Sequence, residues 1–167
     1  PHSRFYRSNN EGDNLFVCSI VALHGSDGSY AWHYQMNPGE EWDWTCTQSI
    51  VSADLEIDGK PRQGLMQAPK NGFFYVLDRK TGEFISAKNH VIQNWNEGFD
   101  DKGRPITSEA VRYGFDPKLV MPGPGGAHNW FPMAFSPRTG LYYASHWEDS
   151  SIIAVGGQFP QPVSTNR

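Results

Sequence analysis

The sequence is poor in cysteine, in net charge and in long apolar runs, and each shortage argues against a class of protein. Only two cysteines occur, Cys18 and Cys46, which is too few for a disulfide framework, and we expect two separate buried thiols rather than a bridge. With 14 Lys and Arg against 18 Asp and Glu, the net charge is −4, so a nucleic-acid-binding surface has no electrostatic support. No apolar run is long enough to span a membrane.

Recognisable catalytic and binding motifs are also missing. The six histidines and two cysteines show no zinc-ligand spacing. No phosphate-binding loop, hydrolase nucleophile elbow or dinucleotide fingerprint is present. The first residues lack the pattern of a signal peptide, and a chain that starts at Pro1 is expected to be processed or excised from a longer one.

Aromatic residues and turn formers are, by contrast, abundant. Aromatics make up 14% of the chain, with six Trp, alongside 17 Gly and 12 Pro. Many aromatic residues placed between many turns are typical of all-β proteins. We therefore predict an all-β fold with no helix of more than a few turns.

The middle of the chain carries the strongest local signals. Strands are predicted at Gly64–Ala68, Phe73–Leu77 and Glu83–Ser86. The Asn-Gly pair at 71–72 predicts a type I′ hairpin turn, since both central residues of that turn need positive φ, and a second turn ends at Gly82. The continuous apolar run Phe73–Leu77 predicts a strand covered on both faces. Three antiparallel strands on tight turns form a meander, the unit from which propeller blades are made.

A similar order of strand, turn ending in glycine and aromatic strand occurs twice more. It is predicted at Asn14–Leu23 followed by Ser29–Gln35, and again at Pro132–Phe135 followed by Leu141–Ala144. Repeats at roughly 40–50 residues indicate stacked units, and four-stranded blades lie in that range. The pattern therefore predicts a propeller-like arrangement of antiparallel sheets.

Two long stretches between the repeats are predicted to be irregular, Met36–Thr47 and Asn89–Trp130. The second contains a Gly- and Pro-rich run at 122–126 and a candidate helical turn at Ser108–Tyr113. Beyond it, Ile152–Val155 predicts one more strand. Long loops on a rigid β scaffold are where binding and catalytic residues usually lie, so both stretches are candidates for function.

An acidic, tryptophan-rich segment in the first of these stretches is the first chemical candidate. It reads Glu40-Glu41-Trp42-Asp43-Trp44. A carboxylate beside large apolar rings loses hydration, so it needs a cation to hold its charge, or its pKa rises. Either outcome suits a general base or a Ca²⁺ ligand. The alternative is a solvated acidic loop whose tryptophans dock into the core.

Lys70 and the segment His128-Asn129-Trp130 are the other candidates. Lys70 follows Pro69, which fixes its direction, and its ammonium suits an anionic ligand. The alternative is a surface lysine. His128-Asn129-Trp130 follows the glycine-rich run, which lets backbone approach a ligand closely. The alternative there is a satisfied polar cluster under a loop.

Four ordered motifs together resemble the pyrroloquinoline quinone (PQQ) dependent alcohol dehydrogenases, the quinoproteins and quinohaemoproteins of the bacterial periplasm. The matching stretches are GDNLFVCSIVAL, GEEWDWTCTQ, APKNGFFYVLDRKTGEFISAKN and PGPGGAHNWFPMAFSPRTGLYY, which cover most of residues 12–143 in the family's order. The resemblance implies a periplasmic protein and an eight-bladed β-propeller of four-stranded antiparallel blades. It also implies PQQ near the propeller axis, with Ca²⁺ beneath the quinone.

The resemblance further implies roles for three residues. Asp43 matches the family's catalytic aspartate in the WD[WY]T motif, which takes the substrate hydroxyl proton and lies at the Ca²⁺. Lys70 matches the residue that reaches the quinone oxygens, and Asn129 matches an asparagine of the cofactor pocket. The implied chemistry is oxidation of a small alcohol to an aldehyde by hydride transfer to PQQ, with Ca²⁺ polarising the quinone carbonyl.

The chain departs from the family in its extent. Family propellers need several hundred residues, so residues 1–167 predict a single partial propeller domain with about one whole blade and parts of two or three others. The family's other Ca²⁺ ligands, its vicinal-cysteine ring and the tryptophan beneath the quinone lie upstream of the matching segments. The PQQ and Ca²⁺ sites are therefore expected to be incomplete, and no Cys-x-x-Cys-His haem site is present. Residues 145–167 drift from the family pattern.

Two functions of different class follow from these observations. The first is a piece of a PQQ- and Ca²⁺-dependent alcohol dehydrogenase, with little activity as an isolated chain. The second is a non-catalytic propeller fragment that self-associates into a homodimer or a larger closed species. We expect self-association because the apolar strand Phe73–Leu77 lacks, in this partial propeller, the neighbouring blade that would cover it.

Overall fold

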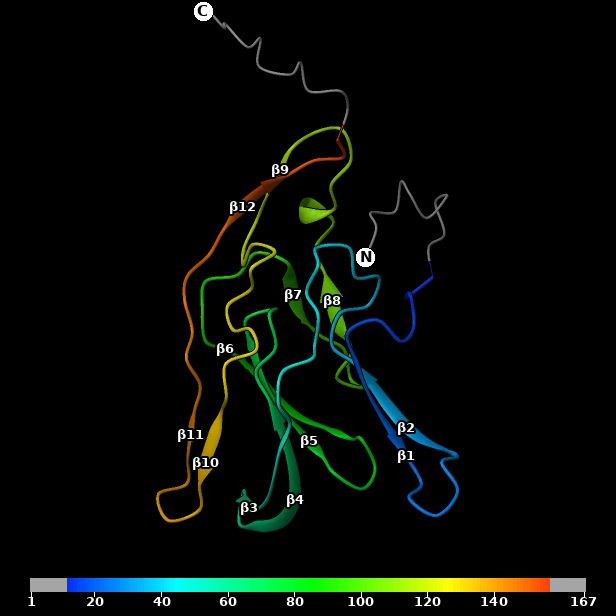
Figure 1. The fold of residues 1–167 in the computed structure, drawn as a ribbon, viewed down its shortest axis with the longest axis vertical. Helices are drawn as coiled ribbons and strands as arrows, with labels where there is room; N and C mark the ends of the chain where they lie inside the picture. The colour runs from blue at the N-terminus through cyan, green and yellow to red at the C-terminus, as the bar shows by residue number, and fades with distance from the viewer. Residues whose placement is uncertain (1–11, 157–167) are drawn as a thin grey trace, which may run out of the picture.

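The computed structural model describes residues 12–156, and these residues form a nearly all-β structure (Figure 1). Its one helical segment in this range is the single 3-10 turn η1 (Glu109–Val111), inside the predicted helical turn. No helix in this part of the chain is long and apolar enough to cross a membrane. The strands are β1 (Ser19–Leu23), β2 (Tyr30–Gln35), β3 (Val51–Ile57), β4 (Lys60–Gln67), β5 (Phe73–Asp78), β6 (Phe84–Asn89), β7 (Asn96–Phe99), β8 (Pro105–Thr107), β9 (Lys118–Val120), β10 (Ala134–Ser136), β11 (Leu141–Tyr143) and β12 (Ser151–Ile153).

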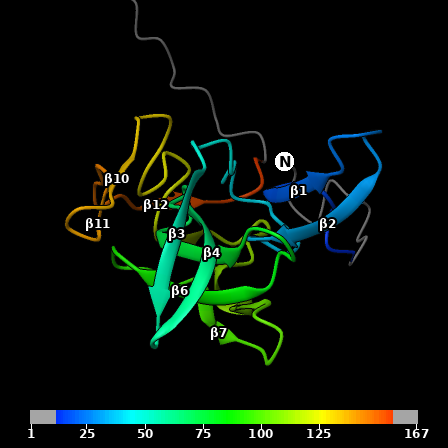
Figure 2. The same cartoon turned by 90° about the horizontal axis from the view of Figure 1, so that it is seen from below.

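One four-stranded antiparallel sheet, in the order β3-β4-β5-β6, forms the centre of the structure. The other strands pair two by two, as β1-β2, β7-β8, β9-β12 and β10-β11. Figures 1 and 2 show the β1-β2 and β10-β11 hairpins on opposite sides of the central sheet. The arrangement of one complete sheet between partial ones confirms the prediction of one whole antiparallel blade with parts of others.

Strand β5 is the most deeply buried strand of the central sheet because its sequence is apolar at nearly every position. Tyr75 and Leu77 are fully buried, and Phe73 packs edge-on against Trp95 and Phe99. Burying side chains of this size contributes ~1.5–3 kcal/mol each to folding, so β5 anchors the core. This confirms the prediction of a strand covered on both faces.

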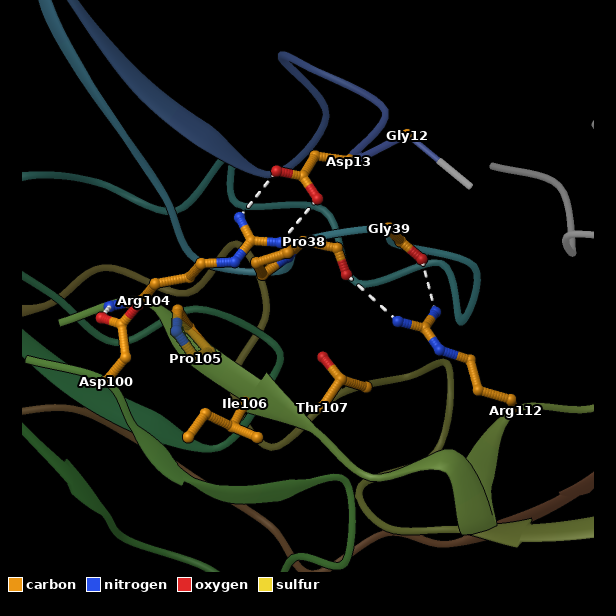
Figure 3. Close-up of a pocket in the computed structure, with 10 residues that line it drawn as sticks. All are labelled: Gly12, Asp13, Pro38, Gly39, Asp100, Arg104, Pro105, Ile106, Thr107 and Arg112. Carbon is orange, nitrogen blue, oxygen red and sulfur yellow. Dashed lines mark hydrogen bonds and ion pairs between the residues drawn. The ribbon is translucent and has the colours of Figure 1, made fainter. Parts of the chain in front are cut away.

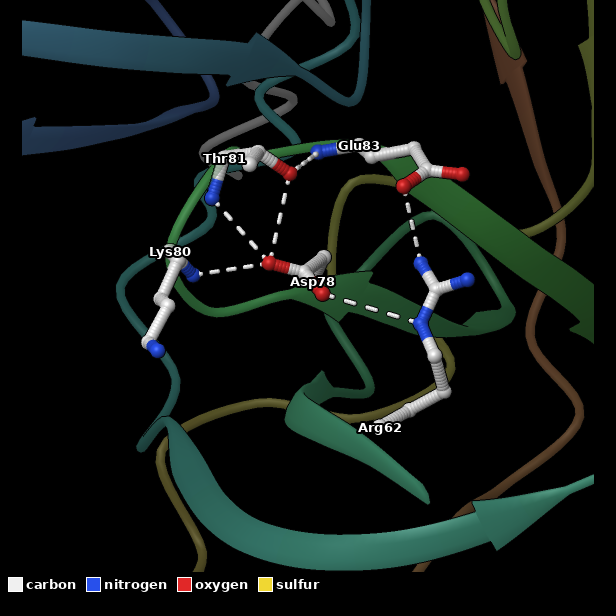
Figure 4. Close-up of polar contacts among 5 residues, drawn as sticks. All are labelled: Arg62, Asp78, Lys80, Thr81 and Glu83. Atoms are coloured by element: carbon white, nitrogen blue, oxygen red, sulfur yellow. Dashed lines mark hydrogen bonds and ion pairs between the residues drawn. The ribbon is translucent and has the colours of Figure 1, made fainter. Parts of the chain in front are cut away.

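The turn between β5 and β6 has the geometry that its sequence predicts (Figure 4). The Asp78 carboxylate accepts the backbone N–H of Thr81 at 3.1 Å and its hydroxyl at 3.2 Å, and Gly82 has a φ of +73°. Arg62 of β4 lies 3.6 Å from Asp78 and donates to Glu83 at 2.8 Å. A side chain that accepts hydrogen bonds from its own turn fixes the chain reversal locally.

The predicted type I′ turn at 71–72 is wrong. Gly72 has a φ of +87°, but Asn71 is not among the residues with positive φ, and five residues connect β4 to β5. The buried Asn71 amide donates to Asn37 Oδ1 at 2.8 Å and to the Tyr75 hydroxyl at 2.9 Å. These long-range bonds set the conformation of Asn71, so the local preference of the Asn-Gly pair does not decide it.

Other segment boundaries also differ from the predictions. Strand β1 starts at Ser19 and not at Asn14, because a turn occupies residues 15–18. Asn14 before this turn and Cys18 at its end have positive φ, +58° and +50°. The stretch Asn89–Trp130 contains the β7-β8 hairpin and β9, which are short and lack an alternating pattern. Strand β3 also went unpredicted. The later strands β10, β11 and β12 overlap the predicted segments, with ends that differ by one or two residues, and the tail from 157 onward lies outside the described residues.

The two cysteines are joined in a disulfide, so the expectation of separate thiols is wrong. The Cα atoms of Cys18 and Cys46 lie 4.7 Å apart, with 28 residues of sequence separation between them. The start of β1 runs beside the loop that follows Trp44, and the backbone N–H of Met36 donates to Cys18 O at 2.9 Å. This adjacency comes from tertiary packing and has no signal in the spacing of the cysteines. The bridge fastens the loop between β2 and β3 to β1.

The open face expected at Phe73–Leu77 is closed within the chain. The Phe74 ring lies 4.6 Å from the Tyr142 ring of β11, and the β10-β11 hairpin contacts β3. This part of the motive for self-association is therefore wrong, because the chain supplies its own cover for β5. Large apolar side chains that are exposed lie elsewhere, at Leu15, Phe16, Val21, Leu23, Tyr30, Ile50, Ile92, Ile106, Phe115, Leu119, Trp130, Phe131, Leu141, Tyr143 and Ile152.

His90, directly after β6, is a titratable side chain that lies largely buried beside other histidines. It lines a cavity of about 320 Å³ with Phe74, Tyr142 and His146, and its ring centroid lies 5.5 Å from that of His146. Burial lowers the pKa of His90 to about 4, and the neighbouring His146 and His128 act in the same direction against a small opposing effect of Glu148. The native state therefore holds this imidazole neutral.

We predict that breaking the disulfide lowers stability. The double variant Cys18→Ala/Cys46→Ala is expected to lose about 3–4 kcal/mol of unfolding free energy, because the bridge closes a long loop and restricts the unfolded chain. Urea unfolding followed by tryptophan fluorescence measures this loss. Adding dithiothreitol should destabilise the wild-type chain similarly and leave the double variant unchanged. Equal stability of the wild type with and without reductant would contradict the prediction.

We also predict a loss of stability in mild acid that depends on His90. An unfolded histidine protonates near pH 6.5, whereas His90 in the native state protonates only near pH 4, so the unfolded state binds more protons between these values. The unfolding free energy should fall as the pH drops from 6.5 to 4. His90→Phe should flatten this dependence, and His24→Gln in the exposed β1-β2 turn should not. The same slope in His90→Phe as in wild type would count against the assignment.

Candidate active site

Asp43 projects outward from a loop that is otherwise anchored in the core. Its neighbours Trp42 and Trp44 are almost fully buried and stack with ring centroids 4.8 Å apart. The Asp43 side chain between them is 58% exposed, and its backbone has a φ of +68°. The alternative of tryptophans docked into the core is therefore correct for the indoles, and the carboxylate between them is presented to solvent.

Lys70 lies against Asp43 and is not a surface lysine. The residue is only 8% exposed, and its ammonium donates to the Asp43 backbone carbonyl at 2.9 Å. Its Nζ also lies 3.8 Å from Asp43 Oδ2. A buried ammonium needs a compensating partner, and Asp43 provides both a carbonyl oxygen and a carboxylate. The structure thus brings together two of the three predicted site residues.

The glycine-rich loop forms a third wall beside Lys70. A Cβ atom at Gly126, where φ is +79°, would lie 2.4 Å from Lys70 Cβ and Cγ, so only glycine fits this approach. The backbone N–H of Ala127 donates to Lys70 O at 2.9 Å, and the indole N–H of Trp44 donates to Gly123 O at 3.0 Å. Three segments that are far apart in the sequence therefore meet around the Lys70 side chain.

Asn129, the third predicted residue, follows this loop, and in the part of the chain that the structure describes its side chain forms no hydrogen bond to Asp43 or Lys70. Its side-chain amide donates to Gly125 O at 3.2 Å, so it stabilises the loop to which it belongs. The adjacent His128 is fully buried, with Nδ1 at the Ser145 carbonyl. The cofactor role of Asn129 stays a prediction.

The residues present fit an anionic quinone and a divalent cation in part. The buried Lys70 ammonium suits an anionic group, and the exposed Asp43 carboxylate beside it suits a cation. Within residues 12–156, however, no group of three or more His, Cys, Asp or Glu side chains is arranged to hold a metal ion. A Ca²⁺ ion at Asp43 would therefore need companion ligands from outside the described residues.

A polar pocket of about 290 Å³ lies at the start of the same loop (Figure 3). Arg104 forms two bonds to the Asp13 carboxylate, at 2.6 and 2.7 Å, and this side-chain hydrogen bonding lowers the pKa of Asp13. Arg112 donates to Gly39 O at 2.6 Å and to Pro38 O at 3.3 Å. Both guanidinium ions bind protein groups, and Arg112 thereby anchors the start of the loop.

Arg112 is a residue that the sequence did not single out. Besides its bonds to the loop backbone, it lies over the Trp42 ring at 4.6 Å, and its Nη1 is 3.4 Å from the buried Glu41 carboxylate. Sequence motifs around position 112 carry no sign of this role, because its partners lie about 70 residues earlier. The anchoring of the acidic loop is thus a tertiary feature.

Comparison with known proteins places this site in a family. Residues 1–91, more than half of the chain, match the PQQ family model described as "Glucose/ethanol/alcohol dehydrogenase, beta-propeller domain". The chain therefore belongs to this family of PQQ β-propeller dehydrogenases.

Similar proteins include the "Quinohemoprotein alcohol dehydrogenase" of Comamonas testosteroni, 55% identical over 143 residues that make up 86% of this chain and 20% of the relative. The "Quinohemoprotein alcohol dehydrogenase ADH IIB" of Pseudomonas putida is 52% identical over 95% of this chain and 23% of its own length. The chain thus spans about a fifth of the length of these curated relatives.

Solved structures agree with this assignment. The crystal structure of the Comamonas testosteroni enzyme matches 86% of this chain and 22% of its own chain, with a TM-score of 0.82. A "Europium-containing methanol dehydrogenase" matches 82% of this chain and 24% of its own, at 34% identity and a TM-score of 0.78. The fold is that of a partial β-propeller.

Proposed function

We propose that this chain is the part of a periplasmic PQQ-dependent alcohol dehydrogenase that supplies the catalytic base, Asp43, and a cofactor-binding lysine, Lys70. The observation that carries the proposal is the contact of the buried Lys70 ammonium with Asp43, at 2.9 Å from its carbonyl and 3.8 Å from its carboxylate. A structural ion pair needs no exposed carboxylate, whereas a base must reach substrate. The names of the relatives, which are alcohol dehydrogenases, support the same reaction.

The roles of the two side chains follow from their exposure. The exposed Asp43 carboxylate can accept the hydroxyl proton of an alcohol, and the Lys70 ammonium lies beside it, with Nζ 3.8 Å from Oδ2. Lys70 has three N–H donors, one of which binds the Asp43 carbonyl, and the others suit an anionic cofactor. Asn129 is proposed to contact the cofactor from the glycine-rich loop.

PQQ, when bound, supplies the acceptor for the hydride that leaves the alcohol carbon. A Ca²⁺ ion held by Asp43 and by ligands outside the described residues would polarise the quinone carbonyl. The Cys18–Cys46 disulfide supports a periplasmic location, because such bridges persist in oxidising compartments. With one calcium ligand and one face of the cofactor pocket, the isolated chain is expected to have little activity.

Turnover tests the role of Asp43 in a chimaera in which this chain replaces the matching segment of the Comamonas testosteroni enzyme. Asp43→Asn should lower kcat at least ~10²-fold, because the amide keeps the shape of the side chain but cannot accept the proton. Asp58→Asn is the matched control, since Asp58 is also an aspartate with positive φ, in the β3-β4 turn. Near-normal turnover of Asp43→Asn would refute the proposed function.

The second candidate, a self-associating propeller fragment, draws on a different surface from the one first expected. Trp130 and Phe131 stack with centroids 5.8 Å apart, and Trp130 is 75% exposed. Exposed rings of this size favour burial against another apolar surface. A second copy of the chain is one such surface, and two-fold pairing is the commonest form of self-association.

Sedimentation of the 167-residue chain at micromolar concentration measures this association. A dimer or larger closed species is expected, and Trp130→Ser/Phe131→Ser should shift it toward the monomer because it removes the exposed ring pair. Leu23→Ser, at an exposed site on β1, is the control that should leave the distribution unchanged. A wild-type chain that is folded and monomeric up to millimolar concentration would exclude this function.

A further inference from the structure

The backbone of Asp43 adopts a conformation that needs external support. A φ of +68° lies in the left-handed region, which residues with a side chain adopt less readily than glycine does. Such residues persist when their surroundings determine the backbone, and they occur often at functional sites. Lys70 and the N–H of Thr45, at 3.1 Å, bind the Asp43 carbonyl, but neither binds the backbone of the residues before and after Asp43.

Glu40 binds the backbone of the residues on both sides of Asp43 through one oxygen atom. Its Oε1 accepts the backbone N–H of Trp42 at 2.7 Å and the backbone N–H of Trp44 at 2.8 Å. The two donors flank Asp43, so a single acceptor sets the distance between them. Hydrogen bonds to a carboxylate are shorter and stronger than bonds between neutral groups, which suits a clamp on a strained residue.

We call the two hydrogen bonds to Glu40 Oε1 the Glu40 clamp. Because Glu40 is buried, forming this clamp costs the desolvation of its carboxylate. The side chain is fully buried, and its second oxygen, Oε2, has no hydrogen-bond partner among the described residues. Burial raises the pKa of Glu40, and the Asp43 carboxylate adds to that effect, while the two N–H donors oppose it. Packing alone does not require a carboxylate here, since an apolar side chain of similar size fills the space without desolvating a charge.

We propose that Glu40 is a positioning residue for Asp43. Its carboxylate holds the two flanking N–H groups and thereby keeps the Asp43 side chain turned outward beside Lys70. This inference rests on the proposed role of Asp43 as base, but the clamp itself is a property of the loop and can be measured without turnover.

Hydrogen exchange of the Trp42 and Trp44 amides in the full 167-residue chain tests the clamp. Glu40→Gln keeps the size of the side chain and removes its charge, so both amides should exchange at least about tenfold faster. Glu40→Asp keeps the charge but is one methylene shorter, so only one of the two amides should stay protected. This second variant reports on the clamp even where Glu40→Gln does not fold.

Glu41→Gln is the matched control, because Glu41 is the adjacent buried carboxylate and contacts Arg112 instead of the two amides. It should leave the exchange of Trp42 and Trp44 within about twofold of wild type. Unchanged exchange of both amides in a folded Glu40→Gln chain would overturn the proposal, and so would equal acceleration in Glu41→Gln.

The chimaera separates this proposal from the proposed function. If Glu40 positions the base, Glu40→Gln should lower kcat at least about fivefold and leave KM within about twofold, because substrate binding does not use the clamp. Faster amide exchange with unchanged kcat would make Glu40 merely structural and overturn the positioning role. Full turnover in Asp43→Asn would instead refute the proposed function, while altered exchange in Glu40→Gln would still support the conformational clamp.

Discussion

A loop without a hydrogen-bonded ladder of its own must find partners elsewhere for its backbone polar groups, and this constraint shapes the region around Asp43. Side chains provide many of those partners for the loop between β2 and β3. They include Glu40, which accepts two N–H groups, and the donors Gln67, Lys70 and Arg112, which bind loop carbonyls. These four are charged or amide side chains that are wholly or largely buried, so each of them is desolvated where it binds the loop.

The two tryptophans connect this polar framework to the apolar core. Their stacked rings are buried with Trp95, while each indole N–H donates to a backbone carbonyl of a distant segment, Val111 or Gly123. The side chains of Trp42 and Trp44 both point into the core. Asp43 lies between them, and its side chain points outward because the core would have to take up a carboxylate otherwise. The exposed carboxylate is therefore a consequence of how its neighbours are buried.

The features that were predicted correctly from the sequence are those that depend on residues close together in the chain. The meander around β5, the turn at Asp78 and the hairpin β10-β11 follow local patterns of apolar residues and turn formers. The family motifs identified Asp43 and Lys70, and the structure places them in contact.

What the sequence did not predict depends on contacts between distant residues. The Cys18–Cys46 bridge, the conformation of Asn71 and the anchoring by Arg112 all join segments that are 28 to 74 residues apart in the sequence. The short strands β7, β8 and β9 form because partners are available, since their own sequences show no alternation. Spacing and composition carry no information on such pairings, as the wrong expectation for the cysteines illustrates.

The conformation of Asp43 depends on segments that fold far from it in the sequence. Removing residues 111–126 would take away the acceptors of both indole N–H groups, the glycine wall against Lys70 and the guanidinium over Trp42. Glu40 would still bind the two amides, but the loop would lose its position relative to Lys70. The bonds to Glu40 therefore act on the local backbone around Asp43, and the packing of later segments sets where the Asp43 carboxylate lies.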